Sequence, residues 1–79
     1  MSIRKAIDLA GGTHASLGAL LGISGEAVRK FTHKGVPAER VIPICEIVNW
    51  KVTPHELRPD IYPIPTDGIP PEVLQSKAA

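Results

Sequence analysis

The chain has 79 residues, enough for one small domain but too few to enclose a deep catalytic cleft readily, so we do not expect an enzyme. Hydrophobic residues make up 43% and aromatic residues only 4%, which argues against global disorder and predicts an aliphatic core. The net charge is +1, but residues 1–36 carry five basic against two acidic side chains, which places any phosphate-binding surface in the N-terminal half.

Three short helices are predicted within the first 35 residues. Apolar residues at helical spacing within 3–10 indicate the first, and a glycine pair follows it. A second helix is expected after the N-cap residue Thr13 and ends at Gly22. A third follows the N-cap residue Ser24 and ends near Gly35. The N-terminal half is therefore predicted to be entirely helical.

Prolines divide the next part of the chain. Pro37 fits the first turn of a helix, but Pro43 lacks an amide hydrogen, so we expect a short turn at 37–41 and a fresh helix from about 42 to 49. The run TPHE at 53–56 combines a capping box with proline at the first helical position. It predicts one more helical turn, ending near Leu57.

The last 22 residues contain five prolines and little apolar periodicity. We therefore expect a helical domain over residues 1–58 and an extended or mobile tail over 59–79. Alternatively, Ile61, Tyr62 and Ile64 fold back as a strap over the domain or pair with a second copy. No convincing strand is present, so the predicted fold class is an all-α small helical bundle.

Several other classes of protein are disfavoured by the sequence. No stretch approaches the roughly 20 apolar residues of a membrane span, and the charged residues Arg4, Lys5 and Asp8 are unlike a signal peptide, so we expect a cytoplasmic protein. The single cysteine, Cys45, is expected to be a buried hydrophobe. The histidines lack metal-ligand spacing, and the best hydroxyls are explained as helix caps, so we expect no metal, cofactor or catalytic residue.

Residues 14–33 carry the most informative pattern, two helices around a tight turn at 21–24. Gly22 supplies the positive backbone angle of the turn, and Gly18 leaves room for the third helix to cross the second. The apolar residues of both helices then meet in a shared core: Leu17, Leu21, Ile23, Val28 and Phe31. This pattern is typical of a helix-turn-helix; the alternative is a helical hairpin whose glycine only reverses the chain.

The outward face of the third helix favours the DNA-binding interpretation. Glu26, Arg29 and His33 lie opposite the apolar stripe, with Gly25, Lys30 and Thr32 on the flanks. Small, polar and basic residues fit a DNA groove, and such a helix enters the major groove while the preceding helix sets its N-terminus against a phosphate. We therefore predict a DNA-binding set: Thr13, His14, Ser24, Gly25, Glu26, Arg29, Lys30, His33 and Lys34.

Different roles are expected within this set. Arg29 is the first choice for base readout, because a guanidinium can bind O6 and N7 of guanine together; its alternative is a solvated helix charge. Glu26 either accepts from a cytosine amine or buttresses a neighbouring basic residue, and we leave both open. Lys30, Lys34, Thr13 and His14 are better placed for phosphates.

Two stretches carry a family resemblance. LGALLGISGEAVRKF at 17–31 resembles the helix-turn-helix of Cro-type phage regulators, with Phe31 where tryptophan is common. VPAERVIPICEI at 36–47, followed by VTPHELRPDIYP at 52–63, is similar to the YdaS-like branch of prophage Cro proteins and candidate antitoxins. The resemblance covers residues 3–63. It departs from the family at Gly25 and His14, where glutamine is frequent, so a direct adenine contact by glutamine is not available.

The resemblance implies a lambda-repressor/Cro-like DNA-binding domain that represses or modulates phage genes. Its expected partner is double-stranded operator DNA, bound as a homodimer in the bacterial cytoplasm and so associated with the nucleoid. The runner-up is an antitoxin or antirepressor that acts mainly through a toxin or phage protein, a function that the proline-rich tail favours.

Overall fold

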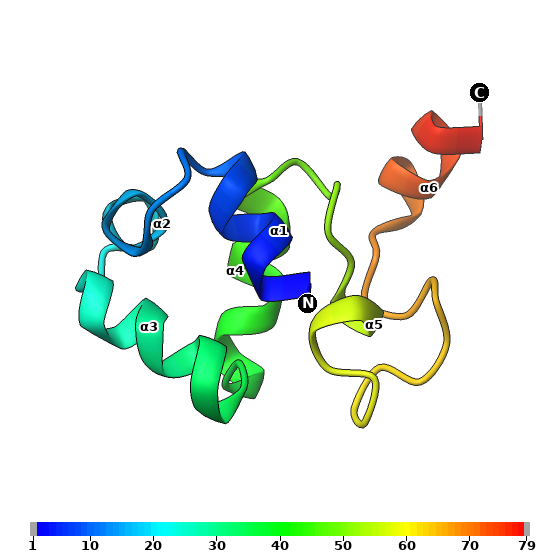
Figure 1. Cartoon of the computed structure of the whole chain (residues 1–79). Coiled ribbons are helices and arrows are strands. Elements are labelled where there is room, and N and C mark those ends of the chain that lie inside the picture. Colours follow the sequence, from blue (N-terminus) through cyan, green and yellow to red (C-terminus); the bar gives the residue numbers. More distant parts are fainter. Residues whose placement is uncertain (1, 79) are drawn as a thin grey trace.

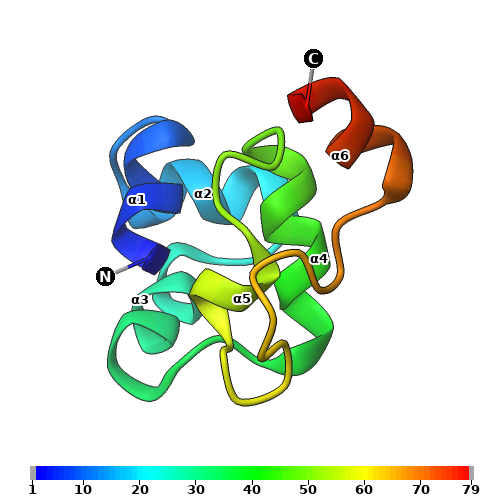
Figure 2. The same ribbon diagram turned by 90° about the vertical axis from the view of Figure 1, so that its right-hand side faces the viewer.

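The computed structural model describes residues 2–78, and within this range it contains six helices and no strand (Figure 1). This confirms the predicted all-α fold class. The helices are α1 (Ser2–Leu9), α2 (His14–Leu21), α3 (Gly25–Lys34), α4 (Ala38–Ile47), α5 (Pro54–Leu57) and α6 (Pro71–Ala78). Figure 2 shows α1 to α5 grouped in one body, from which α6 projects at the end of the chain.

Helix caps determine where the early helices begin and end, as predicted. The hydroxyl of Thr13 accepts a hydrogen bond from the Ser16 amide at 3.0 Å and caps α2. The hydroxyl of Ser24 accepts from the Ala27 amide at 3.2 Å and caps α3. Between the two helices Gly22 is left-handed, with φ 77° and ψ 26°, a conformation that glycine adopts without steric cost.

The hydrophobic core lies between α1, α2, α3 and α4 and is mainly aliphatic. Leu17, Val28 and Phe31 are buried, and Leu21 and Ile23 pack against them, so the predicted shared core of the α2–α3 unit is confirmed. Helix α1 packs on both α2 and α3, and α4 packs on α2. The largest fully buried aliphatic residues are Ile7, Leu17, Val28, Val41, Ile44 and Val52.

The predicted break at Pro43 is wrong. Instead of a turn at 37–41 and a fresh helix from 42, α4 runs unbroken with Pro43 inside it. The proline ring removes one helical hydrogen bond, the one that an amide at this position would donate to the carbonyl of Glu39. That loss is outweighed because one buried stripe spans both sides of the proline. Its members are Val41, Ile44, Cys45 and Val48.

The short helix α5 is confirmed. Thr53 and Glu56 form a complete capping box, and Pro54 stands at the start of the helix. After α5 the chain turns back on the domain. Tyr62 packs against the core, and the Nδ1 atom of His55 lies 2.8 Å from the Tyr62 carbonyl, which can only accept, so the histidine donates.

The tail is not simply extended, and two features correct that prediction. A Cβ atom added to Gly68 would lie 2.9 Å from both Pro54 and Tyr62, so residues near 68 pack on α5 and its following turn. Residues 71–78 form α6, in which the amides of Val73 and Leu74 donate to the carbonyl of Pro70 at 3.0 and 3.1 Å. Proline at the first helical position starts a helix rather than breaking one, which explains the error. The domain boundary after residue 58 stays a prediction.

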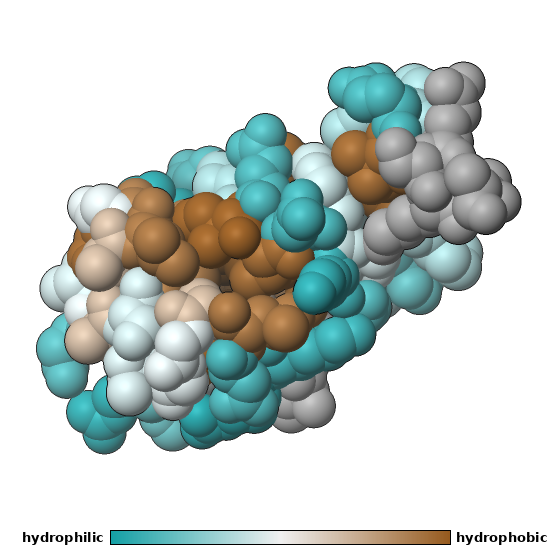
Figure 3. All heavy atoms as spheres, turned by 90° about the horizontal axis from the view of Figure 1, so that it is seen from above, coloured by the Kyte–Doolittle hydropathy of each residue, from teal (hydrophilic) through white to brown (hydrophobic). Residues whose placement is uncertain are grey.

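A face away from α3 is apolar. Leu9 in α1 and Leu20 in α2 have exposed fractions of 45% and 58%. Figure 3 shows hydrophobic residues gathered over the side of the protein on which these two helices lie, whereas α3 lies on the opposite, lower side in Figure 1. The protein therefore presents an apolar and a polar surface on different sides. Within residues 2–78, every helix is too short or too polar to cross a lipid bilayer.

Candidate nucleic-acid interface

Helices α2 and α3 approach each other at two glycines. A Cβ atom on Gly18 would lie 2.7 Å from the carbonyl oxygen of Ile23, in the turn that leads to α3. A Cβ atom on Gly25, the first residue of α3, would lie 3.1 Å from the backbone nitrogen of Ala15 in α2. These close backbone contacts fix the start of α3 against α2. The tight approach at Gly18 was predicted from the sequence, whereas the packing role of Gly25 was missed.

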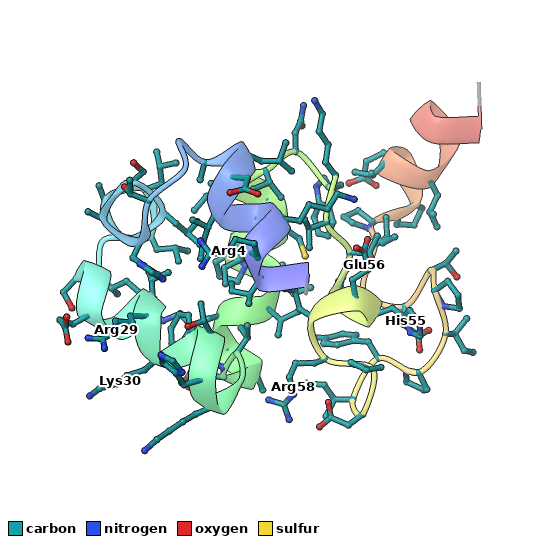
Figure 4. The ribbon with its side chains drawn as sticks, in the orientation of Figure 1. Arg4, Arg29, Lys30, His55, Glu56 and Arg58 are labelled. Carbon is teal, nitrogen blue, oxygen red and sulfur yellow. The ribbon has the colours of Figure 1, made fainter. Side chains whose placement is uncertain are left out.

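Helix α3 has one buried and one exposed face. Val28 and Phe31 point into the core, and the exposed residues on the other side are Glu26, Arg29, Lys30, His33 and Lys34. Figure 4 shows the side chains of Arg29 and Lys30 extending from α3 away from the protein body. Three of these side chains, Arg29, Lys30 and Lys34, carry positive charge, and Glu26 is the one acidic side chain among the five. The face is therefore available to a polyanion and biased toward positive charge.

The guanidinium of Arg29 forms a loose ion pair with Glu26. Nη1 of Arg29 lies 3.6 Å from Oε1 of Glu26, and the two side chains are 59% and 77% exposed. An ion pair this exposed contributes little to stability, so either group can turn to another partner at small cost. The geometry matches the buttressing role for Glu26, one of the two alternatives predicted from the sequence.

The remaining predicted contact residues lie at the N-terminal ends of the two helices. The Thr13 hydroxyl is 2.8 Å from that of Ser16 and also caps α2, and the Ser24 hydroxyl caps α3. Both residues are exposed, and His14 is half-buried in the first turn of α2. The first backbone amides of a helix have no carbonyl partners within the helix, so the N-terminal end of α2 offers hydrogen-bond donors.

Arg58 and Asp60 are the polar residues near this unit that sequence reasoning missed. Arg58 follows α5, yet its Nη1 donates to the carbonyl oxygen of Val36, in the link after α3, at 2.7 Å. Nε and Nη2 donate to the two carboxylate oxygens of Asp60, at 2.9 and 2.6 Å. The contact joins residues 22 positions apart, so no local pattern could reveal it.

This pairing changes the proton affinity of both groups. The hydrogen bond from Arg58 lowers the pKa of Asp60 from 3.8 to about 2. The hydrogen bond to Asp60 raises the pKa of Arg58 above its ordinary value. Both groups therefore remain ionised throughout the physiological pH range.

The structure offers no support for a metal centre in the part of the chain that it describes. No group of three or more His, Cys, Asp or Glu residues there is arranged to hold a metal ion. His55 is engaged with the Tyr62 carbonyl, and His33 lies on the exposed face of α3. The cluster with a functional pattern is thus the α2–α3 unit and its polar face.

Comparison with known proteins bears on this unit and on the helices that follow it. The family model described as bacterial toxin YdaS matches residues 3–66. No curated protein matches the chain, and no solved structure matches it. The family match spans both stretches on which the YdaS-like resemblance was based, at 36–47 and 52–63. The chain therefore belongs to the bacterial toxin YdaS family.

Proposed function

We propose that this protein is a sequence-specific, double-stranded DNA-binding regulator of prophage transcription and not an enzyme. The observation that carries the proposal is the construction of α3. Its start is fixed by close backbone contacts at Gly18 and Gly25, while its outer face presents polar and basic side chains. A rigidly held helix with such a face is suited to the major groove, as in Cro-type regulators.

The side chains divide into base-reading and phosphate-binding groups. Arg29 extends from the middle of α3 and can donate two hydrogen bonds to guanine once it leaves Glu26. Lys30 and Lys34 extend to one side and are placed for phosphates. Backbone amides at the N-terminus of α2, together with Thr13 and His14, bind a phosphate on the other DNA strand. None of these contacts requires a cofactor.

A homodimer on DNA is part of the proposal. A single short recognition helix buries little surface, and two copies give the affinity that operator binding needs. Two α3 helices on one face of DNA must be about 34 Å apart, one helical turn. We expect the operator to be a palindrome with half-sites about 10 base pairs apart. Protection of a single half-site at full affinity would contradict the dimer.

The decisive experiment compares Arg29→Ala and Lys30→Ala on DNA selected by the wild-type protein and on random DNA. Loss of a base contact at Arg29 is expected to cost about 1–3 kcal/mol on selected DNA and much less on random DNA. Loss of a phosphate contact at Lys30 is expected to weaken both and to reduce the slope of log K against log salt by about one unit. The exposed Lys51, in the link after α4, provides a control variant, Lys51→Ala.

Failure to select any sequence from a random library would refute sequence-specific binding. Equal losses on both DNAs for Arg29→Ala would remove that residue from base readout. Arg29, Lys30 and Lys51 are exposed, so circular dichroism is expected to show that all three alanine variants are folded.

A second candidate function is supported by the description of the family as a toxin and by the apolar face over α1 and α2. Exposed apolar surface of this kind is typical of protein–protein contact sites. In this alternative the chain acts in a toxin–antitoxin system by binding another protein. Induced expression in a bacterial host separates the two: a growth defect abolished by Arg29→Ala indicates action on DNA, and one abolished only by Leu9→Lys or Leu20→Lys indicates a protein partner.

A further inference from the structure

A short link follows the C-terminal end of α3 and leads to α4. Gly35 ends the helix with φ 96°, its amide donating to the Phe31 carbonyl at 3.0 Å, and α4 begins at Ala38. Between them, Val36 is 3% exposed, so its side chain is held in the core. The carbonyl of the same residue points the other way, toward Arg58, and accepts its 2.7 Å hydrogen bond.

Arg58 reaches this link from the far end of α5. Figure 4 shows its side chain directed toward the side of the protein on which α3 ends. The carboxylate of Asp60 accepts hydrogen bonds from Nε and Nη2 of the guanidinium, and Nη1 donates to the Val36 carbonyl. A bidentate carboxylate fixes the plane of a guanidinium as well as its position. The side chain is therefore held as a rigid bridge between the end of α5 and the end of α3.

The charge balance argues against a phosphate-binding role for Arg58. Its positive charge is neutralised by Asp60 at hydrogen-bonding distance, and three of its five N–H groups are already used. Binding a phosphate would place that anion next to the Asp60 carboxylate, which stays ionised because its pKa is about 2. Arg58 is suited to hold the backbone and not to neutralise DNA.

Position along α3 determines how such a bridge affects recognition. The N-terminal end of the helix is fixed against α2 at Gly25, so freeing the C-terminal end lets the helix pivot about its start. Arg29 lies five residues before Lys34, the last residue of α3, which is about 7.5 Å along the helix axis. A pivot moves residues near the C-terminal end most, so His33 and Lys34 are displaced more than Glu26. Side chains that must match base edges lose more from this than side chains that contact phosphates.

We propose that Arg58, clamped by Asp60, is a positioning residue for DNA recognition: it holds the carbonyl of Val36 and thereby sets the angle at which α3 presents its outer face. This inference rests on the proposed function. It also assigns a role to Asp60, which lies in the segment that the sequence-based boundary after residue 58 separates from the DNA-binding domain.

The test uses the full chain in three variants. Arg58→Ala removes the bridge, Arg58→Lys keeps the charge but not the planar fork, and Asp60→Asn weakens the grip on the guanidinium. Lys51→Ala is the control for loss of one positive charge away from the link. Affinity is measured on wild-type-selected DNA and on random DNA at several salt concentrations. Hydrogen exchange of the amides of residues 31–36 is measured without DNA.

Both Arg58 variants are expected to bind selected DNA about tenfold more weakly, with little change on random DNA, since a misplaced base contact is worth at least about that factor. The salt slope is expected to stay as in the wild type, and amide exchange near the end of α3 is expected to accelerate. Asp60→Asn is expected to fall between the wild type and Arg58→Ala. Lys51→Ala is expected to leave discrimination and exchange unchanged.

Three results would overturn the inference. A salt slope reduced by about one unit in Arg58→Ala and restored in Arg58→Lys would make Arg58 a phosphate contact. If Arg58→Ala lost affinity equally on selected and random DNA, in proportion to its loss of stability in urea, Arg58 would have only a structural role. Unchanged amide exchange in Arg58→Ala would show that the bridge does not hold α3. If amide exchange accelerates in Arg58→Ala but the wild type selects no DNA sequence, Arg58 does hold the end of α3. The proposed function, and with it the recognition role of Arg58, is then refuted.

Discussion

The substitution Gly18→Ala tests whether the α2–α3 crossing depends on close backbone contact. The added Cβ would lie 2.7 Å from the Ile23 carbonyl oxygen and 3.0 Å from the carbonyl carbon and oxygen of Ser24. All three are backbone atoms of the turn and cannot rotate away. To reach an ordinary contact of 3.4 Å the turn must move by about 0.7 Å, which displaces the start of α3.

Two opposite effects determine the net change in stability. Alanine is favoured over glycine inside a helix by about 1 kcal/mol. Overpacking of this kind costs about 1–3 kcal/mol, and contact with rigid backbone favours the upper part of that range. We therefore expect Gly18→Ala to lower the free energy of unfolding by about 1–2 kcal/mol. In a domain of this size that corresponds to a fall in Tm of at least about 4 °C.

Urea unfolding followed by circular dichroism measures the effect. Ala19→Gly, at the adjacent exposed position of α2, reports the helix propensity alone and is expected to cost about 1 kcal/mol. If Gly18→Ala instead raised stability by that same amount, the propensity would be acting unopposed. The close approach would then be refuted, together with the argument that α3 is fixed at its start.

Three further predictions concern the rest of the fold. Pro43→Ala is expected to raise the urea midpoint by an amount equivalent to about 1–2 kcal/mol. The helical hydrogen bond to the Glu39 carbonyl is restored, and the greater freedom of the unfolded chain offsets only part of that gain. An unchanged midpoint would mean that α4 has adapted fully to its proline. Thr53→Ala removes the cap of α5 and is expected to lower the free energy of unfolding by about 1 kcal/mol in the same assay. An unchanged midpoint would show that the capping box does not contribute to stability. The pKa of Asp60 is about 2 in the folded protein, against an ordinary value of 3.8. The contribution of its pair with Arg58 to stability is therefore complete above pH 3.8 and declines as the pH falls toward 2. An NMR titration of Asp60 with a midpoint near 3.8 would contradict the pairing.

The sequence by itself determined the helices that begin and end on local signals. Thr13, Ser24 and the capping box at Thr53 act through hydrogen bonds three residues away, so their effect is readable without the fold. Gly22 likewise meets a purely local demand for positive φ. The face of α3 followed from helical periodicity, because burial of Val28 and Phe31 leaves Arg29 and Lys30 outside. These features were sufficient to predict the α2–α3 unit, whereas the family resemblance was based on the stretches at 36–47 and 52–63.

Tertiary structure decided the features in which local preference and long-range packing compete. Pro43 disfavours a helix locally, yet burial on both sides of it keeps α4 continuous. The packing role of Gly25 depends on Ala15 in another helix, and the bridge from Arg58 depends on Val36, 22 residues away. Such pairs meet only after the core has brought distant segments together, because hydrophobic burial sets the path of the chain without regard to sequence separation. That is why the outer face of α3 could be read from the sequence, while the means by which its two ends are held in place could not.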